Sequence, residues 1–408
     1  MKNQAINAVK WDISTFLFAL LIVLSSNTYA FDVGGFKVKW SQVALIVYCV
    51  FNFFMIIRLF YGKTGIVDRF TNFALFSIIA YAIFSMSYTL DIGLTLKTLV
   101  LIIFNVLAFY VVVASLRYRA LLYNNMRKVT IMLFWLFVLL TTIHYFLGFY
   151  VPEFRTPMNT IGALFGGIKA SVFFNESNWH CNYMFFLYFT IYLFYRKGYV
   201  KRKVMNRVVL GMFIVSMICL SRVCFLIFIV HFIFYYLGVN KKLLVVFILG
   251  GVLFYYSPIP KMLLPERYTV DLYDHDVNIR YIDSSFLIEE VGKYKRTTIG
   301  MGLGTLAVVN KYNRYRSADD EFSGTTINIL PVQLYFDYGL LGLLFFSAIF
   351  LWGIIRTKNE DTRFILIASF IFCSFHMPGY MTFFWVFMGY FYYLLNVLPL
   401  RKHKYRIC

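Results

Sequence analysis

Charged residues are scarce in this chain of 408 residues. Only 14% of the residues are charged, 61% are hydrophobic, and the mean hydropathy is +0.70. A soluble domain carries about 25% charged residues, so an ordinary soluble protein is excluded. Several apolar runs reach the roughly 17–25 residues that cross a hydrocarbon core of about 30 Å. The ten-residue alternation of a membrane barrel is absent. The sequence therefore predicts an all-α polytopic membrane protein.

Metal-ligand and catalytic-triad patterns are also missing. The six cysteines form no CxxC pair and no Cys/His spacing typical of zinc, so neither a disulfide framework nor a zinc site is predicted. We find no Ser-His-Asp arrangement, no DxD motif and no intramembrane acidic relay of the kind that a proton-driven transporter uses. The sequence thus predicts no metal and no cofactor.

Acidic residues are outnumbered, 19 against 39 Lys and Arg, which gives a net charge of +20. Most basic residues fall in segments that would share one side of a membrane, which is the positive-inside pattern rather than a nucleic-acid surface. The clusters are Arg58–Arg69, Arg117–Lys128, Arg196–Arg207, Lys241–Lys242, Arg356–Arg363 and Arg401–Arg406.

We predict about twelve spans in three regions. Residues 1–257 hold nine spans and a smaller outside loop near 150–178, residues 258–329 form a large outside loop, and residues 330–408 hold three spans and a tail. Both termini would be cytoplasmic and the large loop periplasmic, in a bacterial inner membrane. The end of the first span resembles a signal-peptide cleavage site, but a retained helix is favoured. The predicted spans are 13–30, 41–58, 70–88, 93–114, 129–149, 179–195, 206–220, 222–237, 243–257, 330–353, 364–378 and 380–398.

Arginines are the first candidates for chemistry. The fifteen residues from Arg207 to Arg222 make about 22 Å of helix, less than the core thickness, so Arg222 would lie below the outer surface. Such a residue is either functional or an interfacial arginine that reaches outward. Together with Arg280 and Arg296 of the large loop, it would suit a diphosphate, because the guanidinium fork matches phosphate oxygens. The alternative for the loop arginines is a solvated surface.

Three further segments carry candidates. In Phe173–Trp179, Glu176 could act as a base toward a sugar hydroxyl or orient it, while its neighbours could simply cap and anchor the next helix. The glycines of Gly300-Met301-Gly302 could bring backbone N–H groups to an anion or form a plain re-entrant turn. Asn328 could bind ligand or cap a helix, and Lys169 ends a Gly-rich stretch as a further substrate-binding candidate.

The order of these segments resembles a known family. Ser221-Arg222, a loop arginine, the glycine turn and the helix that contains Asp337-Tyr338-Gly339 are similar to the O-antigen polymerase and ligase superfamily of bacterial inner membranes. The Phe-Phe-Asn-Glu-Ser segment is similar to one in exopolysaccharide polymerases. The resemblance covers roughly residues 160–355. The proline common before the glycine turn is replaced by Thr297-Thr298.

The resemblance implies a GT-C-like membrane glycosyltransferase that works without a metal. Donor and acceptor would be undecaprenyl-diphosphate-linked glycans, Arg222 and Arg280 would neutralise the leaving diphosphate, and Glu176 would serve the acceptor hydroxyl. Asn328 stands where ligases carry a histidine, which favours an O-antigen polymerase over a ligase. A partner protein that regulates chain length is compatible with this function. A lipid-linked oligosaccharide flippase is the alternative from another class, but transporters seldom need so long an outside loop.

Overall fold

The computed structural model describes residues 11–26, 30–33, 36–54, 57, 67–151, 170, 172, 174, 177–219, 221–239, 285–310, 330–376 and 381–398. These residues are mostly helical. Two π-helical turns, η3 (Phe232–Tyr236) and η5 (Tyr393–Val397), continue α9 and α17. The helices are α1 (Ile13–Ser25), α2 (Trp40–Phe51), α4 (Arg69–Ser85), α5 (Ile92–Tyr118), α6 (Ala120–Tyr150), α7 (Ser177–Arg196), α8 (Arg202–Cys219), α9 (Arg222–His231), α14 (Leu306–Asn310), α15 (Leu330–Arg356), α16 (Glu360–His376) and α17 (Thr382–Tyr392).

Each predicted span except 243–257, which lies outside the described residues, overlaps a helix, but the ends differ by up to nine residues. The predicted first span, 13–30, is wrong at its end, because Ala30 lies in a strand. Within the described part of the chain, three helices are long and apolar enough to cross a membrane: Ile92–Tyr118, Asn125–Gly148 and Leu330–Arg356. The predicted helical class is confirmed, and these three helices could span a membrane. The number of spans stays a prediction.

Short strands between α1 and α2 were not predicted from the sequence. Strands β1 (Ala30–Val33) and β2 (Phe36–Lys39) pair antiparallel, with Val33 opposite Phe36. The two intervening residues are Gly34 and Gly35, and a Gly-Gly pair favours a tight hairpin turn. The apolar character of the flanking spans hides so short a signal. The described chain is therefore helical with one small hairpin.

Aspartates start three of the helices. Asp12, Asp68 and Asp91 each accept a backbone N–H in the first turn, of α1, α4 and α5 respectively. The distance from the Leu94 nitrogen to Asp91 Oδ1 is 2.9 Å. Such a cap stabilises a helix by about 0.5–2 kcal/mol. Three of the few acidic residues in this chain are therefore helix N-caps.

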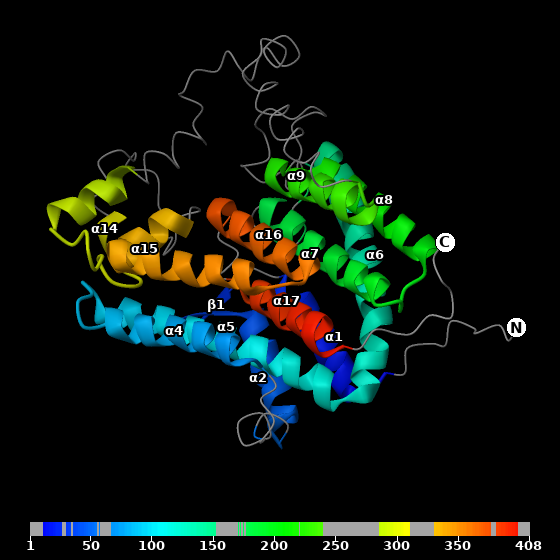
Figure 1. Ribbon diagram of the computed structural model, residues 1–408, viewed down its shortest axis with the longest axis horizontal. Coiled ribbons are helices and arrows are strands. Elements are labelled where there is room, and N and C mark those ends of the chain that lie inside the picture. Colours follow the sequence, from blue (N-terminus) through cyan, green and yellow to red (C-terminus); the bar gives the residue numbers. More distant parts are fainter. Residues whose placement is uncertain are drawn as a thin grey trace, which may run out of the picture.

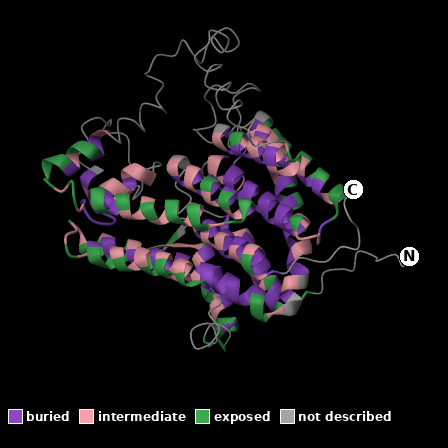
Figure 2. Ribbon diagram, viewed as in Figure 1, coloured by how far each residue is buried: buried purple, intermediate pink, exposed green. Residues whose placement is uncertain are grey.

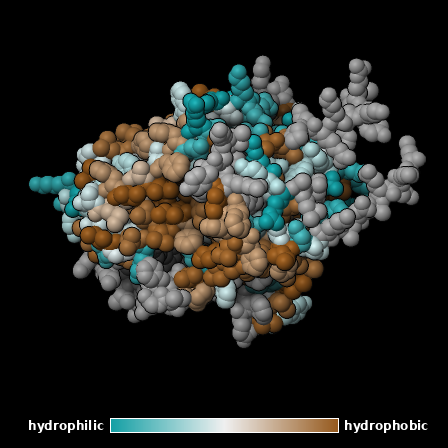
Figure 3. Space-filling view, turned by 90° about the horizontal axis from the view of Figure 1, so that it is seen from below, coloured by the Kyte–Doolittle hydropathy of each residue, from teal (hydrophilic) through white to brown (hydrophobic). Residues whose placement is uncertain are grey.

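Helix α7 lies at the centre of the bundle. Every residue from His180 to Phe194 is buried, and the main core gathers around it from α1, α5, α6, α8, α9, α16 and α17. Figure 1 shows these helices packed side by side, and Figure 2 shows the buried residues concentrated there. By contrast, α4 and α15 expose apolar side chains along much of their length. Figure 3 shows the broad hydrophobic area on one side of the molecule that results.

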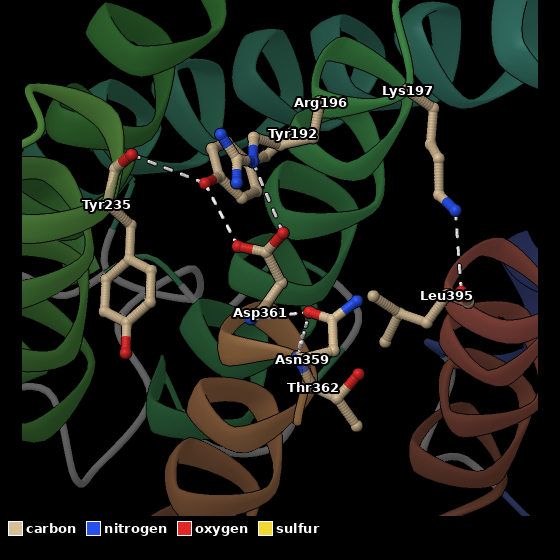
Figure 4. Close-up of polar contacts among 8 residues, drawn as sticks. All are labelled: Tyr192, Arg196, Lys197, Tyr235, Asn359, Asp361, Thr362 and Leu395. Atoms are coloured by element: carbon tan, nitrogen blue, oxygen red, sulfur yellow. Dashed lines mark hydrogen bonds and ion pairs between the residues drawn. The ribbon is translucent and has the colours of Figure 1, made fainter. Parts of the chain in front are cut away.

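One end of the bundle, here called the basic end, gathers the turns rich in Lys and Arg. Arg127 of α6 donates to the Tyr199 carbonyl in the α7–α8 turn at 2.8 Å. Arg196, at the end of α7, pairs with Asp361 of α16 at 3.3 Å, and Tyr192 donates to the same carboxylate (Figure 4). Lys197 donates to carbonyl oxygens at the end of η5. The α15–α16 turn joins this end through Asp361.

The starts of α4 and α5 lie at opposite ends of the bundle. Arg356, the last residue of α15, lies over the Phe70 ring at the start of α4, 5.5 Å from its centroid. Tyr392 donates to Asp68 at 3.0 Å, which also brings the start of α4 to the basic end. The α4–α5 turn is therefore at the far end of the bundle.

Candidate functional site

The first turns of α7 and α9 meet far from the basic end. The Cys224 thiol of α9 donates to the Cys181 carbonyl of α7 at 3.3 Å. In the sequence, α7 begins directly after Glu176, and α9 begins with Arg222. Glu176 itself and the Arg222 side chain lie outside the described residues. The structure thus brings together the two helix starts that the sequence singled out, 45 positions apart by number.

Polar side chains are buried where these helix starts meet. His180 and Asn182 of α7, Ser216 of α8 and Ser221 before α9 are all 2% exposed or less. Ser221 is the N-cap residue of α9, but its side chain makes no capping hydrogen bond. Buried polar groups in proteins are nearly always hydrogen-bonded, and exceptions need an explanation. This concentration of polar groups at the end of an apolar bundle is typical of a binding site.

His180 connects this region to α6. Its Nε2 atom lies 2.7 Å from Thr141 Oγ1, and its ring packs against Phe174, with 5.7 Å between ring centroids. Nearby, the Val172 N–H donates to Nδ1 of His144 at 3.4 Å. The stretch that precedes Glu176 in the sequence is therefore anchored on α6 and on the start of α7.

Residues 285–310, the described part of the large loop, pack on the opposite half of the bundle. They comprise a helix over 285–293, the glycine turn and α14. Phe286, Leu287 and Leu306 form a small core with Phe336 of α15. In Figure 1 this segment lies against the beginning of α15. We call residues 285–310 the docked segment.

Helix α15 is broken at Gly339, and the docked segment fills the break. Gly339 has a φ of 65°, and the N–H groups of Leu340 and Leu341 donate to the carbonyls of Thr297 and Thr298. In return, the Met301 N–H donates to the Phe336 carbonyl at 2.7 Å. Non-helical backbone at membrane depth needs such partners, because lipid offers none.

Gly300 and Gly302 make this approach feasible. Both have positive φ, and a Cβ added at Gly300 would lie 2.5 Å from the backbone nitrogens of Tyr338 and Gly339. The Gly300 N–H donates to the Arg296 carbonyl and the Gly302 N–H to the Asp337 carbonyl. These two N–H groups therefore have protein acceptors. The geometry matches the re-entrant turn, one of the two predicted readings.

Arg296 also has a partner within the protein. Its Nη1 donates to the Tyr88 carbonyl in the α4–α5 turn. Asp337 is buried and accepts from Gln333 Nε2 at 2.7 Å. Arg296 thus links the docked segment to the far end of α4.

The remaining predicted residues, Lys169, Arg280 and Asn328, lie outside the described residues. Sequence reasoning missed His180 and Thr141 as parts of the site. For His180 a signal was present, because it follows Glu176 by four positions in the sequence. Nothing local marks Thr141, whose role depends on contact between two helices.

Among the described residues, no group of three His, Cys, Asp or Glu side chains is arranged to hold a metal ion. The described residues offer buried polar side chains beside an apolar interior where α7 and α9 meet. No family model matches the chain, and no curated protein matches its sequence.

Proposed function

We propose that the protein is a GT-C-like glycosyltransferase with about twelve membrane spans. It joins undecaprenyl-diphosphate-linked oligosaccharide repeats into O-antigen or a related surface polysaccharide at the periplasmic face of the bacterial inner membrane. The large loop and the starts of α7 and α9 face the periplasm, and the basic end faces the cytoplasm. Both termini are cytoplasmic in this orientation.

The convergence of α7 and α9 is the observation that carries the proposal. It places the position of Arg222 and the residue after Glu176 at the same end of the bundle. Helix α7 has 20 residues, or about 30 Å, between this end and Arg196 at the basic end. That length matches the hydrocarbon core, so the site lies at one membrane face.

The proposed chemistry assigns opposite tasks to the two helix starts. Arg222, with Arg280 of the large loop, neutralises the diphosphate as it leaves the donor, and such electrostatic stabilisation is usually a large part of catalysis. Glu176 orients or deprotonates the acceptor hydroxyl. Lys169 and Asn328 are further contacts to substrate. Arg296, through the Tyr88 carbonyl, holds the docked segment against the α4–α5 turn.

A deletion strain that carries variants on a plasmid tests the proposal. Arg222→Ala and Arg280→Ala should leave protein levels unchanged and abolish long-chain polysaccharide, so that single repeats remain on the core. Lys203→Ala is the control, because this exposed lysine lies in the first turn of α8 at the basic end and should leave the ladder of chain lengths intact.

The deletion strain separates the alternatives. One repeat per core indicates a polymerase, and bare core with accumulated lipid-linked polymer indicates a ligase. Bare core with precursor retained on the cytoplasmic side indicates a flippase. A normal ladder in both arginine variants would contradict the assigned site.

A further inference from the structure

Lys39 is a lysine without an acidic partner in the described part of the chain. It is the last residue of β2 and the N-cap of α2. Its ammonium nitrogen lies 3.6 Å from the Met381 sulfur, and a thioether is only a weak acceptor. Its backbone N–H donates to Gln42 Oε1 at 2.8 Å, which fixes the start of the helix. The positive charge of this partly buried side chain is therefore held by a single weak contact.

Such a charge is unfavourable unless an anion joins it. Burial lowers the pKa of Lys39, and no charged group of the described chain acts in the other direction. Charges that leave water in proteins are normally paired. A lysine near a membrane surface usually extends its ammonium group into water. Lys39 directs its ammonium group toward Met381 instead, so we read it as one half of an ion pair with a ligand.

Lys39 lies at the same end of the bundle as the start of α7. Next to it on α2, Ser41 donates to Thr382 Oγ1 of α17 at 3.2 Å. The following residue, Phe383, packs on Tyr183 of α7, with 5.7 Å between ring centroids. The first turns of α2 and α17 therefore pack beside the first two turns of α7.

Helix α7 separates Lys39 from the start of α9. Tyr183 faces α17, whereas the Cys181 thiol faces Cys224 of α9. Two residues that are two positions apart on a helix point about 200° away from each other. Lys39 and the start of α9 thus lie on opposite sides of α7, and a cation at Lys39 serves a different anion from a cation on α9.

An apolar groove begins further along the same helix. It lies between α2 and α5 and exposes no polar surface. Its first lining residue is six positions beyond Lys39, or about 9 Å along the helix. The groove and the charge beside it fit a molecule with an anionic head and a long hydrocarbon chain. The lining includes Leu45, Cys49 and Phe53 on one face of α2, with Phe104 and Leu107 of α5.

We propose that Lys39 binds the diphosphate of the lipid-linked acceptor, whose isoprenoid chain lies in the groove between α2 and α5. This inference rests on the proposed function, in which the diphosphate of the donor leaves while the acceptor keeps its own. The enzyme then holds two diphosphates at once, and Arg222 and Arg280 are assigned to the first. A repeat unit separates the second diphosphate from the attacking hydroxyl, so Lys39 contacts substrate but no reacting atom.

Native mass spectrometry of the purified protein with undecaprenyl diphosphate tests the binding site. The wild type should bind two molecules and Lys39→Gln only one. Lys39→Arg keeps the charge and should bind two. Lys97→Gln is the matched control, because it removes an exposed lysine near the start of α5 and should also leave two molecules bound.

Kinetics in liposomes test the role in the reaction. With lipid-linked polymer as a constant donor, Lys39→Gln should raise the KM for the repeat-unit acceptor roughly 10–100-fold, the range for one hydrogen bond to a charged group. The kcat and the melting temperature should change little, because the contact is the same in the ground state and the transition state.

Filling the groove tests where the isoprenoid chain lies. Ile46→Trp adds bulk at the groove and should raise the KM for the full-length acceptor but not for one with a shortened chain. Leu136→Trp, at a similarly exposed apolar position on α6, should leave both KM values unchanged.

The outcomes separate the two proposals. Two bound lipids and an unchanged KM in Lys39→Gln would overturn this site while the proposed function stands. Loss of binding that Lys39→Arg does not restore, together with a lower melting temperature, would make Lys39 structural and would also overturn it. Loss of one bound lipid in Lys39→Gln, from an enzyme that makes no polymer, would support the lipid site and contradict the proposed function.

Discussion

At the residue scale, Gly300 should tolerate substitution less well than its place in a loop suggests. Alanine there would be strained by the positive φ, and its Cβ would meet the backbone of Tyr338 and Gly339 rather than a movable side chain. We expect Gly300→Ala to lower the free energy of unfolding by about 1–3 kcal/mol from backbone strain, and further through the steric clash. Gly292→Ala is the control, because a Cβ there meets nothing within 4 Å. Thermal unfolding in detergent measures both, and equal melting temperatures would contradict the packing of the turn.

Asp68 gives a prediction about pH. Burial raises the pKa of its carboxyl, but hydrogen bonds from Thr71 and Tyr392 outweigh burial and leave the pKa below its ordinary value. A carboxyl with a lowered folded-state pKa stabilises the protein above the unfolded value of about 3.9, and this contribution is lost as pH falls through the folded value.

Asp68→Asn should therefore have a lower melting temperature than wild type at pH 7. This difference in melting temperature should shrink as the pH falls below about 4. Melting temperatures across a pH series measure the gap. A gap that stays constant down to pH 3 would mean that the carboxylate charge at Asp68 contributes nothing.

At the element scale, Arg296 fastens the docked segment to the α4–α5 turn. Arg296→Gln should loosen this contact and increase amide hydrogen exchange in residues 285–310, while exchange in α7 stays low because that helix is central. Lys293→Gln removes the same charge from the same segment but breaks only an exposed pair with Glu290, so it should change exchange little. Similar exchange in the two variants would show that Arg296 is dispensable for docking.

The elements also show what sequence could and could not predict. Apolar runs and aspartate caps are local, so the predicted spans coincide with helices to within several residues, except the one outside the described part of the chain. The break of α15 at Gly339 was not predicted, because its hydrogen bonds come from Thr297 and Thr298, about forty positions earlier. Arg296 was predicted to bind phosphate because charge is visible in a sequence, whereas its acceptor, a backbone carbonyl, is not.

The candidate site also combines local features that a sequence shows with contacts between helices that it does not. Arg222 and the stretch before α7 are predicted from residue type and spacing, and the structure brings the starts of α7 and α9 together. The contact between His180 and Thr141 was missed because it joins two different helices. Pairing of buried polar atoms across helices is a property of packing and leaves no pattern within a single span.

At the scale of the whole molecule, the distribution of basic residues and the length of α7 predict an orientation in the membrane. The basic end carries Arg196, Lys197 and the turns that contact them, while the starts of α7 and α9 lie about 30 Å away along α7. Basic residues favour the cytoplasmic side, so we expect Lys203 to face the cytoplasm and Lys293, in the docked segment, to face the periplasm.

Single cysteines at these two positions, in a variant without native cysteines that still makes polymer, test the orientation. Both lysines are exposed, so a membrane-impermeant maleimide can reach whichever one faces it. In cells with a permeabilised outer membrane, Lys293→Cys should be labelled and Lys203→Cys only after the inner membrane is broken. If Lys203→Cys alone is labelled while the inner membrane is intact, the orientation is the opposite of the one proposed. The site would then face the cytoplasm, where it could not join repeat units that are presented in the periplasm. That result would contradict the proposed function.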